Sequence, residues 1–415
     1  MDRNLRLLGI GGAIRTLGAA LYNPFLALFL VNALGVSYID VGFIFVLVGG
    51  IQLPFAILGG LITDRFPRHR LILISLVAEA IATGGLAYAF ALRSLAGAIG
   101  AALAGGIVTT AMGPAFSAYV ADFAQGSDRT RGFTWYRIGF NAGYSAGVTV
   151  GGLLIGPFGF AAAVATGAVI IAGGAVFVGT ALEPSPRDSR PRASEGAGEP
   201  SAGTQQPPRR GMVESLRILA RDRVALELLV AIALTALVVG QWGVTFPLYV
   251  RNILGVPYSL LGVGLAFNGL VVVFGQSATT NRVLGWRHTT IAVLAIGLYG
   301  VAFLGLGVAG LLALAPVVAF FVSVLILTIG ENLITIPQNT LPSNLAPPEE
   351  IGSYNGAFNM VGGLGGILSV LVGGIVLEAT HNPLLIWMIL LVPAIPAVVL
   401  FRHAATRLSP AVDRA

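Results

Sequence analysis

Long apolar stretches separated by short polar segments recur along all 415 residues. Each stretch has about 20 residues or more, which as a helix is enough to cross the roughly 30 Å hydrocarbon core of a bilayer. The pattern therefore predicts an all-α polytopic membrane protein. The twelve predicted spans are 5–31, 39–62, 71–91, 95–120, 134–156, 159–181, 224–249, 258–280, 288–309, 312–343, 353–377 and 383–402.

One long polar segment divides the spans into six and six. Residues 183–211 are rich in Pro, Ser, Gly and Arg, a composition with too little apolar surface to fold, so we expect a disordered linker. Residues 212–223 then place apolar side chains on one helical face, as in a helix lying at the membrane interface. The predicted domains are a six-helix bundle at 1–182, the linker, the interfacial helix, a second six-helix bundle at 224–403 and a cytoplasmic tail at 404–415.

The two bundles are related in sequence. Residues 32–42 (NALGVSYIDVG) recur as residues 252–262 (NILGVPYSLLG), and Pro24 aligns with Pro247 near the ends of the first and seventh spans. Six helices per half give both copies the same orientation, so we expect parallel repeats related by an axis along the membrane normal.

Arginine fixes the predicted orientation. With the N-terminus inside, 21 arginines fall at cytoplasmic segments and helix ends, and two (Arg93 and Arg251) fall outside. Cytoplasmic loops carry such an excess of cations, so both termini are expected in the cytoplasm of a cell (plasma or inner) membrane.

The composition of the chain argues against several classes of function. The chain is 56% hydrophobic and only 10% charged, far from a soluble protein. It has no cysteine, and its four histidines lie at span ends without metal-ligand spacing. The net charge of +6 comes from arginines that flank spans, which indicates topology rather than nucleic-acid binding. We therefore expect no enzyme, no catalytic residue, no metal and no cofactor other than a proton gradient.

The loop at residues 60–70 (GLITDRFPRHR) is the first dense run of charge. It resembles the motif between the second and third helices of the major facilitator superfamily of transporters, with Pro67 and His69 as departures. In that family the aspartate caps the eleventh helix, here expected near Ser353, and holds the cytoplasmic side closed. The alternative is that these are ordinary topology-fixing charges. The gating residues that the resemblance implies are Gly60, Asp64, Arg65, Arg68 and Arg70, with Asp122 expected to join Arg70 or Arg131.

A second stretch carries glycines at Gly143, Gly147, Gly151 and Gly152 in the fifth span. It resembles the fifth-helix motif of drug:proton antiporters, with Val148 in place of the proline. Glycines four residues apart also let two helices approach closely, so simple packing is the alternative.

Three charged residues fall deep inside predicted spans, away from the span ends: Arg15, Glu79 and Glu331. Each costs at least about 2.5–3.5 kcal/mol at the bilayer centre unless it is paired or hydrated. The family resemblance implies that Arg15 and Glu331 face the central cavity and pair across the halves, with Glu79 more peripheral. Glu331 is then a candidate for proton coupling; the alternative is a static bridge between helices one and ten. The arginine that the family's proton antiporters carry in the fourth helix is absent.

Other polar residues at cavity depth can bind a solute or tie helices together: Tyr22, Asn23, Asn141, Gln241, Trp242, Asn268 and Asn359. Such a cavity is mostly apolar with few fixed charges. We therefore expect a monomeric secondary transporter that uses protons to export hydrophobic or amphiphilic small molecules, with membrane lipid as its surroundings. The alternatives are proton-coupled uptake of a small organic solute and a non-transporting receptor or scaffold.

Overall fold

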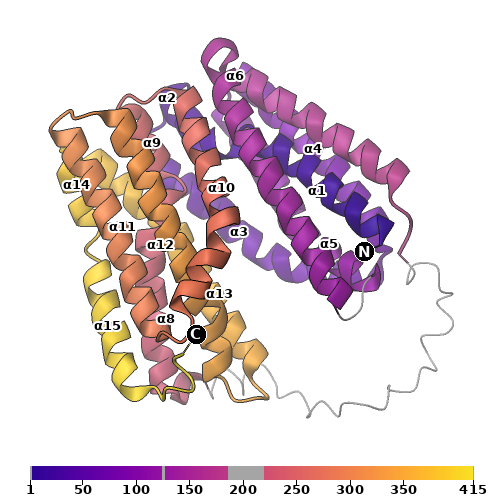
Figure 1. Ribbon diagram of the computed structural model, residues 1–415. Coiled ribbons are helices and arrows are strands. Elements are labelled where there is room, and N and C mark those ends of the chain that lie inside the picture. The colour runs from indigo at the N-terminus through magenta and orange to yellow at the C-terminus, as the bar shows by residue number, and fades with distance from the viewer. Residues whose placement is uncertain (1, 124–126, 186–218, 415) are drawn as a thin grey trace, which may run out of the picture. The chain divides into compact units, whose positions relative to one another are not determined.

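The computed structural model describes residues 2–123, 127–185 and 219–414. Most of the predicted linker and interfacial helix therefore lies outside the described residues. Helices joined by short turns make up the described chain, which contains no β-sheet (Figure 1).

The helices of the first half follow the predicted spans closely. Gly159, with φ 81°, interrupts α6 and divides it into two arms, which correspond to the predicted spans 134–156 and 159–181. The elements are α1 (Arg3–Ala20), η1 (Asn23–Phe25), α2 (Leu26–Asn32), α3 (Tyr38–Arg65), α4 (Arg68–Ala91), α5 (Leu95–Phe123) and α6 (Ser127–Ala181).

The second half repeats this order. Its last helix runs to Arg407, four residues beyond the predicted end of the bundle at residue 403. The elements are α8 (Arg223–Val239), η3 (Gly240–Trp242), α9 (Thr245–Asn252), α10 (Tyr258–Val283), α11 (His288–Leu311), α12 (Pro316–Leu345), α13 (Ile351–Ala379), α14 (Pro383–Leu390) and α15 (Ala394–Arg407).

Ten stretches of the described residues are long and apolar enough to cross a membrane. One of them, Arg131–Ala181, contains both arms of α6, and α3 contributes the shorter apolar helix Tyr38–Gln52 in addition to the ten. The ten stretches are therefore compatible with the twelve predicted spans.

The first and seventh predicted spans are broken helices. The first is interrupted by η1, which contains Pro24, and the seventh by η3, just before the helix that contains Pro247. Proline cannot donate an intrahelical hydrogen bond and its ring clashes with the preceding turn, so these breaks follow from the residues that aligned in the repeat.

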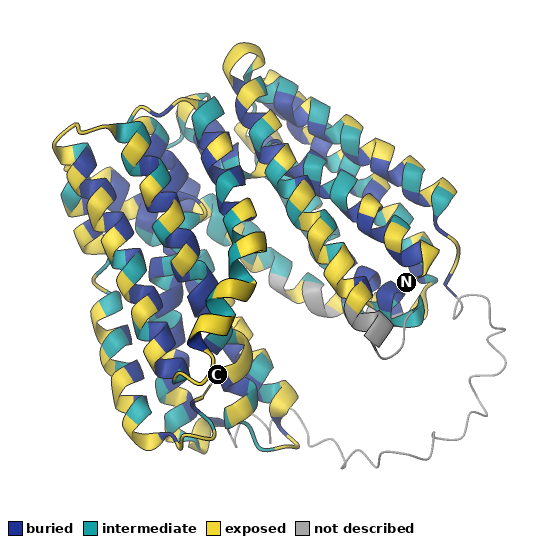
Figure 2. Cartoon of the chain, viewed as in Figure 1, coloured by how far each residue is buried: buried dark blue, intermediate teal, exposed yellow. Residues whose placement is uncertain are grey.

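The chain divides into two compact units, each with its own core (Figure 2). Unit 1 comprises Met1–Ser37, Phe43–Gly198 and Val256–Gly269; unit 2 comprises Tyr38–Gly42, Glu199–Gly255 and Leu270–Ala415. In unit 1 the start of α10 packs on α6, because a Cβ built on Gly152 would lie 3.0 Å from Cα of Gly262.

Within unit 1, α1 lies between the two arms of α6. Gly143, Gly147 and Gly151 of the first arm face α1, and a Cβ built on any of them would lie 2.1–2.4 Å from a carbonyl oxygen of α1 or of Leu21 just after it. On the other side, Gly18 meets Gly167 of the second arm, with a built Cβ 2.7 Å from its carbonyl oxygen. The predicted glycine motif is thus a close-packing face that fixes the position of α1.

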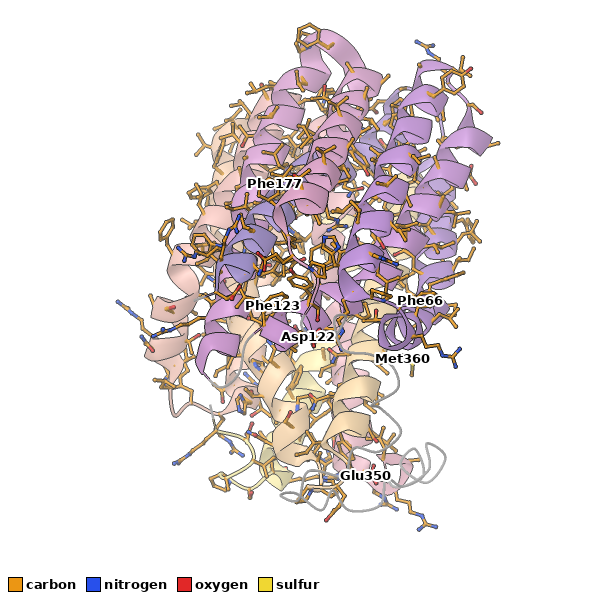
Figure 3. All side chains as sticks on the ribbon, turned by 90° about the vertical axis from the view of Figure 1, so that its right-hand side faces the viewer. Phe66, Asp122, Phe123, Phe177, Glu350 and Met360 are labelled. Carbon is orange, nitrogen blue, oxygen red and sulfur yellow. The ribbon has the colours of Figure 1, made fainter. Side chains whose placement is uncertain are left out.

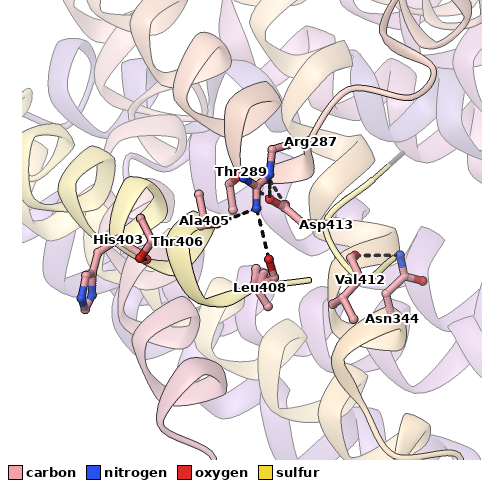
Figure 4. A network of polar contacts seen from close by, with 9 residues as sticks. All are labelled: Arg287, Thr289, Asn344, His403, Ala405, Thr406, Leu408, Val412 and Asp413. Carbon is pink, nitrogen blue, oxygen red and sulfur yellow. Dashed lines mark hydrogen bonds and ion pairs between the residues drawn. The ribbon is translucent and has the colours of Figure 1, made fainter. Parts of the chain in front are cut away.

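In unit 2 the C-terminal segment is bound to the start of α11 (Figure 4). Asp413 is fully buried. One of its oxygens accepts from the backbone N–H of Thr289 at 2.9 Å, and the other accepts from the Thr289 hydroxyl at 2.8 Å and from Nε of Arg287 at 2.6 Å. The predicted tail therefore ends in an ordered carboxylate that caps a helix N-terminus.

Asp413→Asn is expected to lower the free energy of unfolding by about 1–3 kcal/mol, because a buried carboxylate with several charge-assisted hydrogen bonds is replaced by a neutral amide. The loss would be measured as a lower midpoint of thermal unfolding in detergent. Arg414→Gln alters the adjacent exposed residue and serves as the control, with no change expected. Equal midpoints for the two variants would show that this cap contributes nothing.

Candidate functional site

A buried ion pair joins α1 to α4 inside unit 1. Nε of Arg15 lies 2.6 Å from Oε2 of Glu79, and the two side chains are 16% and 3% exposed. Both groups are thus largely buried. An unpaired charge in such surroundings would be very costly. The pair neutralises the two charges at the point where α1 is held by α6.

Hydroxyl groups surround this pair. Tyr22, just after α1, shares a hydrogen bond of 3.2 Å with Thr83, which lies one turn after Glu79 on α4. Tyr136 on the first arm of α6 is close enough to interact electrostatically with both charged groups. Arg15, Glu79, Tyr22, Thr83 and Tyr136 form what we call the charged cluster. It brings three helices together around one carboxylate and one guanidinium.

The charged cluster corrects the expected position of Glu79. Arg15 is bound by Glu79 of its own half, and Glu79 is at the centre of the cluster rather than peripheral. Pairing of Arg15 with Glu331 across the halves stays a prediction. Glu331 is half-buried on α12 and interacts electrostatically with Tyr299 of α11. The error arose because the family's peripheral position for the third helix does not say which way one of its side chains points.

A second ion pair lies at the start of α4. Arg68 bonds to Asp122 near the end of α5, and its Nη1 also donates to the carbonyl of Ala118 at 2.9 Å. Ser185, just after α6, donates to the same carboxylate, which sits beside Phe123 (Figure 3). Asp122 is therefore paired with Arg68.

This pairing differs from the expected bond of Asp122 to Arg70 or Arg131, both of which are exposed. Gly60 lies within α3 with open space where a Cβ would be, and Arg65 ends the same helix, exposed. The side chain of Asp64 lies outside the described part of the chain, so its predicted latch stays a prediction.

Unit 2 contains a pocket of about 290 Å³ between α8, α12 and α13. Its polar side chains are the amides of Gln338, Asn339 and Asn359, and no charged residue lines it. Its remaining lining comes from glycine and apolar residues: Ile232, Ala236, Val239, Gly240, Phe358, Gly362, Gly363 and Gly366. The wall is thus apolar with a few neutral donors and acceptors, as in many small-molecule sites.

Sequence reasoning found only one of the three amides. Asn359 was predicted, whereas Gln338 and Asn339 lie near the end of a long span and were not singled out. Their spacing was the available signal. Residues three and four apart share a helix face, and Gln338 and Asn339 lie one turn beyond Thr335, on the helix that carries Glu331.

The other predicted cavity residues have different positions. The amide of Gln241 forms hydrogen bonds within the protein. Its Nε2 donates to the carbonyls of Leu237 and Ser369, each at 2.9 Å, and its Oε1 accepts from Thr245 at 2.6 Å. The remaining positions are as follows: Asn23 is exposed at the start of η1, Asn141 donates to the carbonyl of Arg137, Trp242 packs on Phe246 and Asn268 is buried in α10.

The arrangement includes a pocket for a small solute and a buried carboxylate paired with a guanidinium. Among the described residues no three His, Asp or Glu side chains converge as metal ligands do. The side chains described above offer ion pairing between carboxylates and guanidinium groups and hydrogen bonding by amides and hydroxyls.

Comparison with known proteins agrees with this architecture. An uncharacterized MFS-type transporter, YttB of Bacillus subtilis (strain 168), is 31% identical over 140 residues, which covers 33% of this chain and 34% of that protein. The chain is thus matched over about a third of this relative's length.

Solved structures share the fold over almost the whole chain. The nucleoside transporter NupG has a TM-score of 0.73 at 15% identity, covering 98% of this chain and 99% of that one. The peptide-transporter-family protein PepTSo gives 0.74 at 16%, covering 98% of each chain. The human organic anion transporter MFSD10 gives 0.62 at 18%, covering 96% and 99%.

The sequence model of the Major Facilitator Superfamily matches residues 8–370. This family and the structural relatives are transporters rather than enzymes, and a multi-pass membrane protein with a small-molecule substrate follows from membership. The chain therefore belongs to the Major Facilitator Superfamily of secondary transporters.

Proposed function

We propose that this transporter exports uncharged or weakly charged amphiphilic small molecules in exchange for protons. The observation that carries the proposal is the buried ion pair of Arg15 and Glu79. A carboxylate held away from water beside a cation can lose its charge when it binds a proton, and an acid with this property is the minimum equipment for coupling.

Protonation of Glu79 changes the balance of charge inside unit 1. The neutral acid no longer compensates Arg15, so the guanidinium then requires water, another acceptor or a change in helix position. Tyr22 and Thr83 supply hydroxyl oxygens close by. Because α1 is held against both arms of α6, a shift of Arg15 is transmitted to three helical segments, which is how we propose that proton binding favours one state of the alternating-access cycle.

Glu331 is the competing acid. It was the predicted coupling residue, and it lies half-buried on α12. Glu79 is the stronger candidate because the residue as a whole is only 2% exposed, whereas Glu331 is half-buried.

The pocket of unit 2 supports an uncharged or amphiphilic substrate. Three amides offer both donors and acceptors, and the glycines leave backbone close to the occupant. A phosphate or carboxylate would be desolvated there without a cation among the lining residues, which is unfavourable.

The distribution of arginines supports a cell-membrane orientation with both termini in the cytoplasm. In that orientation the Arg68–Asp122 pair and the Asp413 cap lie at cytoplasmic helix ends, and export means movement away from them.

The test is substrate-driven proton movement in proteoliposomes. Purified wild-type protein with an imposed pH gradient is expected to accumulate lipophilic amines or neutral drugs against their gradient, and the substrate is expected to carry protons the other way. Accumulation only with the opposite gradient would indicate uptake by symport. No counterflow with any solute of a broad panel would favour a non-transporting receptor.

Asn359→Leu is expected to weaken substrate binding about 5- to 10-fold, because one amide contact is lost from the pocket while the helix is kept. Equilibrium binding of a transported solute measures this change. Met360→Leu alters the neighbouring residue, which is 54% exposed and outside the lining, and is expected to bind as the wild type. Identical affinities for both variants would remove the pocket from the substrate path.

A further inference from the structure

An apolar groove runs along the surface of unit 1, between α4 and the second arm of α6. Its volume is about 690 Å³, and its lining is almost purely apolar. Small residues such as Ala80 and Ala172 lie among exposed branched residues: Ile81 is 70% exposed, Val169 72% and Val176 67%. The shape is that of a channel open along one side, suited to a thin flexible hydrocarbon chain.

The groove shares no lining residue with the substrate pocket or with the charged cluster. Glu79 of α4 is buried toward α1, whereas Val77 and Ile81 of the same helix are exposed. Opposite faces of α4 thus serve the two features, as expected for residues two apart on a helix.

A cation marks one end of the groove. Arg70 is exposed in the first turn of α4, three residues before Leu73 and seven before Val77, both of which line the groove. Residues at this spacing lie on one helix face, so Arg70 continues the line of the groove beyond its apolar part. Its neighbour Arg68 is committed to Asp122. The start of α4 adds the positive end of a helix dipole.

We propose that this groove is a specific site for an anionic phospholipid, with one acyl chain between α4 and α6 and the phosphate at Arg70. An apolar channel that ends in a cation matches the two parts of such a lipid. With the arginine-rich side in the cytoplasm, as proposed above, the lipid belongs to the cytoplasmic leaflet, where anionic lipids are concentrated and each nearby arginine contributes about 1 kcal/mol.

Charge and shape favour a lipid over a second copy of this chain. A partner helix would need matching small residues along its whole length to enter the channel, and its apolar face would bring no anion to Arg70. A lipid fills both parts at once, and its flexible chain adapts to the uneven rim.

Native mass spectrometry of the full chain in detergent tests the site. With phosphatidylglycerol and phosphatidylcholine of equal chain length, wild-type protein is expected to retain phosphatidylglycerol about fivefold more strongly at one site, from the single arginine contact. Arg70→Gln is expected to remove this preference. Arg93→Gln, an exposed arginine just after the other end of α4, is the matched control and is expected to keep it.

A second variant tests the groove itself. Ala172→Leu fills the floor and is expected to reduce retention of both lipids; if it fails to fold, Ile81→Ser at the exposed rim takes its place. Equal retention of the two lipids by wild type, or unchanged retention in the groove variant, would overturn the proposal, as would a protein dimer that the groove variant disrupts. Substrate transport is not used as a readout, so failure here is separate from failure of the proposed function.

Discussion

Glu79→Ala is expected to destabilise the protein by about 3–5 kcal/mol, because removal of one partner of a buried ion pair leaves the other charge uncompensated. Arg15, whose side chain is 16% exposed, would be that charge. The measurement is the midpoint of thermal or denaturant-induced unfolding in detergent, followed by size-exclusion chromatography to detect aggregation.

The double variant Arg15→Met with Glu79→Leu separates pairing from packing. Replacing both charges by apolar side chains of similar size is often close to neutral for stability, so the double variant is expected to unfold near the wild-type midpoint while transport is lost. Arg3→Ala breaks an exposed pair with Glu183, 3.8 Å apart, and should change the midpoint little. A double variant as unstable as Glu79→Ala would mean that the two residues do not act as a pair.

Gly143→Ala is also expected to destabilise the protein, for a different reason. A single added Cβ would lie 2.2 Å from the carbonyl oxygen of Ala13, and backbone cannot move aside as a flexible side chain can. Separation of α1 from α6 then loses the packing of the whole glycine face. We expect a loss of about 1–3 kcal/mol or more, seen as reduced membrane yield and a lower unfolding midpoint.

Gly173→Ala is the matched control on the second arm of the same helix. A Cβ built on Gly173 meets nothing within 4 Å, and alanine favours helix over glycine by about 1 kcal/mol. This variant is expected to equal or exceed wild-type stability. If both alanine variants behave alike, the glycine face is not what holds α1.

The fold was largely predictable because membrane spans have a strong signature. The apolar stretches predicted the helices, and the repeat predicted two similar halves. The interruption of the first helix of each half was not predicted, although Pro24 and Pro247 carry a signal for it: a proline cannot donate the hydrogen bond that a continuous helix requires.

The charged cluster was only partly predictable. Burial of Arg15 and Glu79 follows from their positions inside spans, but their pairing depends on how α1 and α4 are rotated about their axes. With a low charge content, the apolar pattern of α4 is nearly uniform around the helix and does not fix that rotation.

Contacts made by the chain after the last helix of each half were also missed. Ser185 follows α6 and bonds to Asp122 near the end of α5, and Asp122 in turn pairs with Arg68 at the start of α4. Asp413 follows α15 and bonds directly to Arg287 and Thr289 at the start of α11. In both halves the end of the sixth helix is thus linked to the start of the third, through Asp122 in the first half and directly in the second. A comparison of the repeats residue by residue does not detect this equivalence.

The central claim is that Glu79 carries the proton, and transport by Glu79→Gln in proteoliposomes tests it most directly. Glutamine keeps the size and a hydrogen-bond acceptor for Arg15 but cannot titrate. The variant is expected to retain substrate counterflow while losing accumulation driven by a pH gradient, whereas Glu331→Gln, measured in parallel, is expected to keep both. Gradient-driven accumulation that survives in Glu79→Gln and disappears in Glu331→Gln would contradict the account.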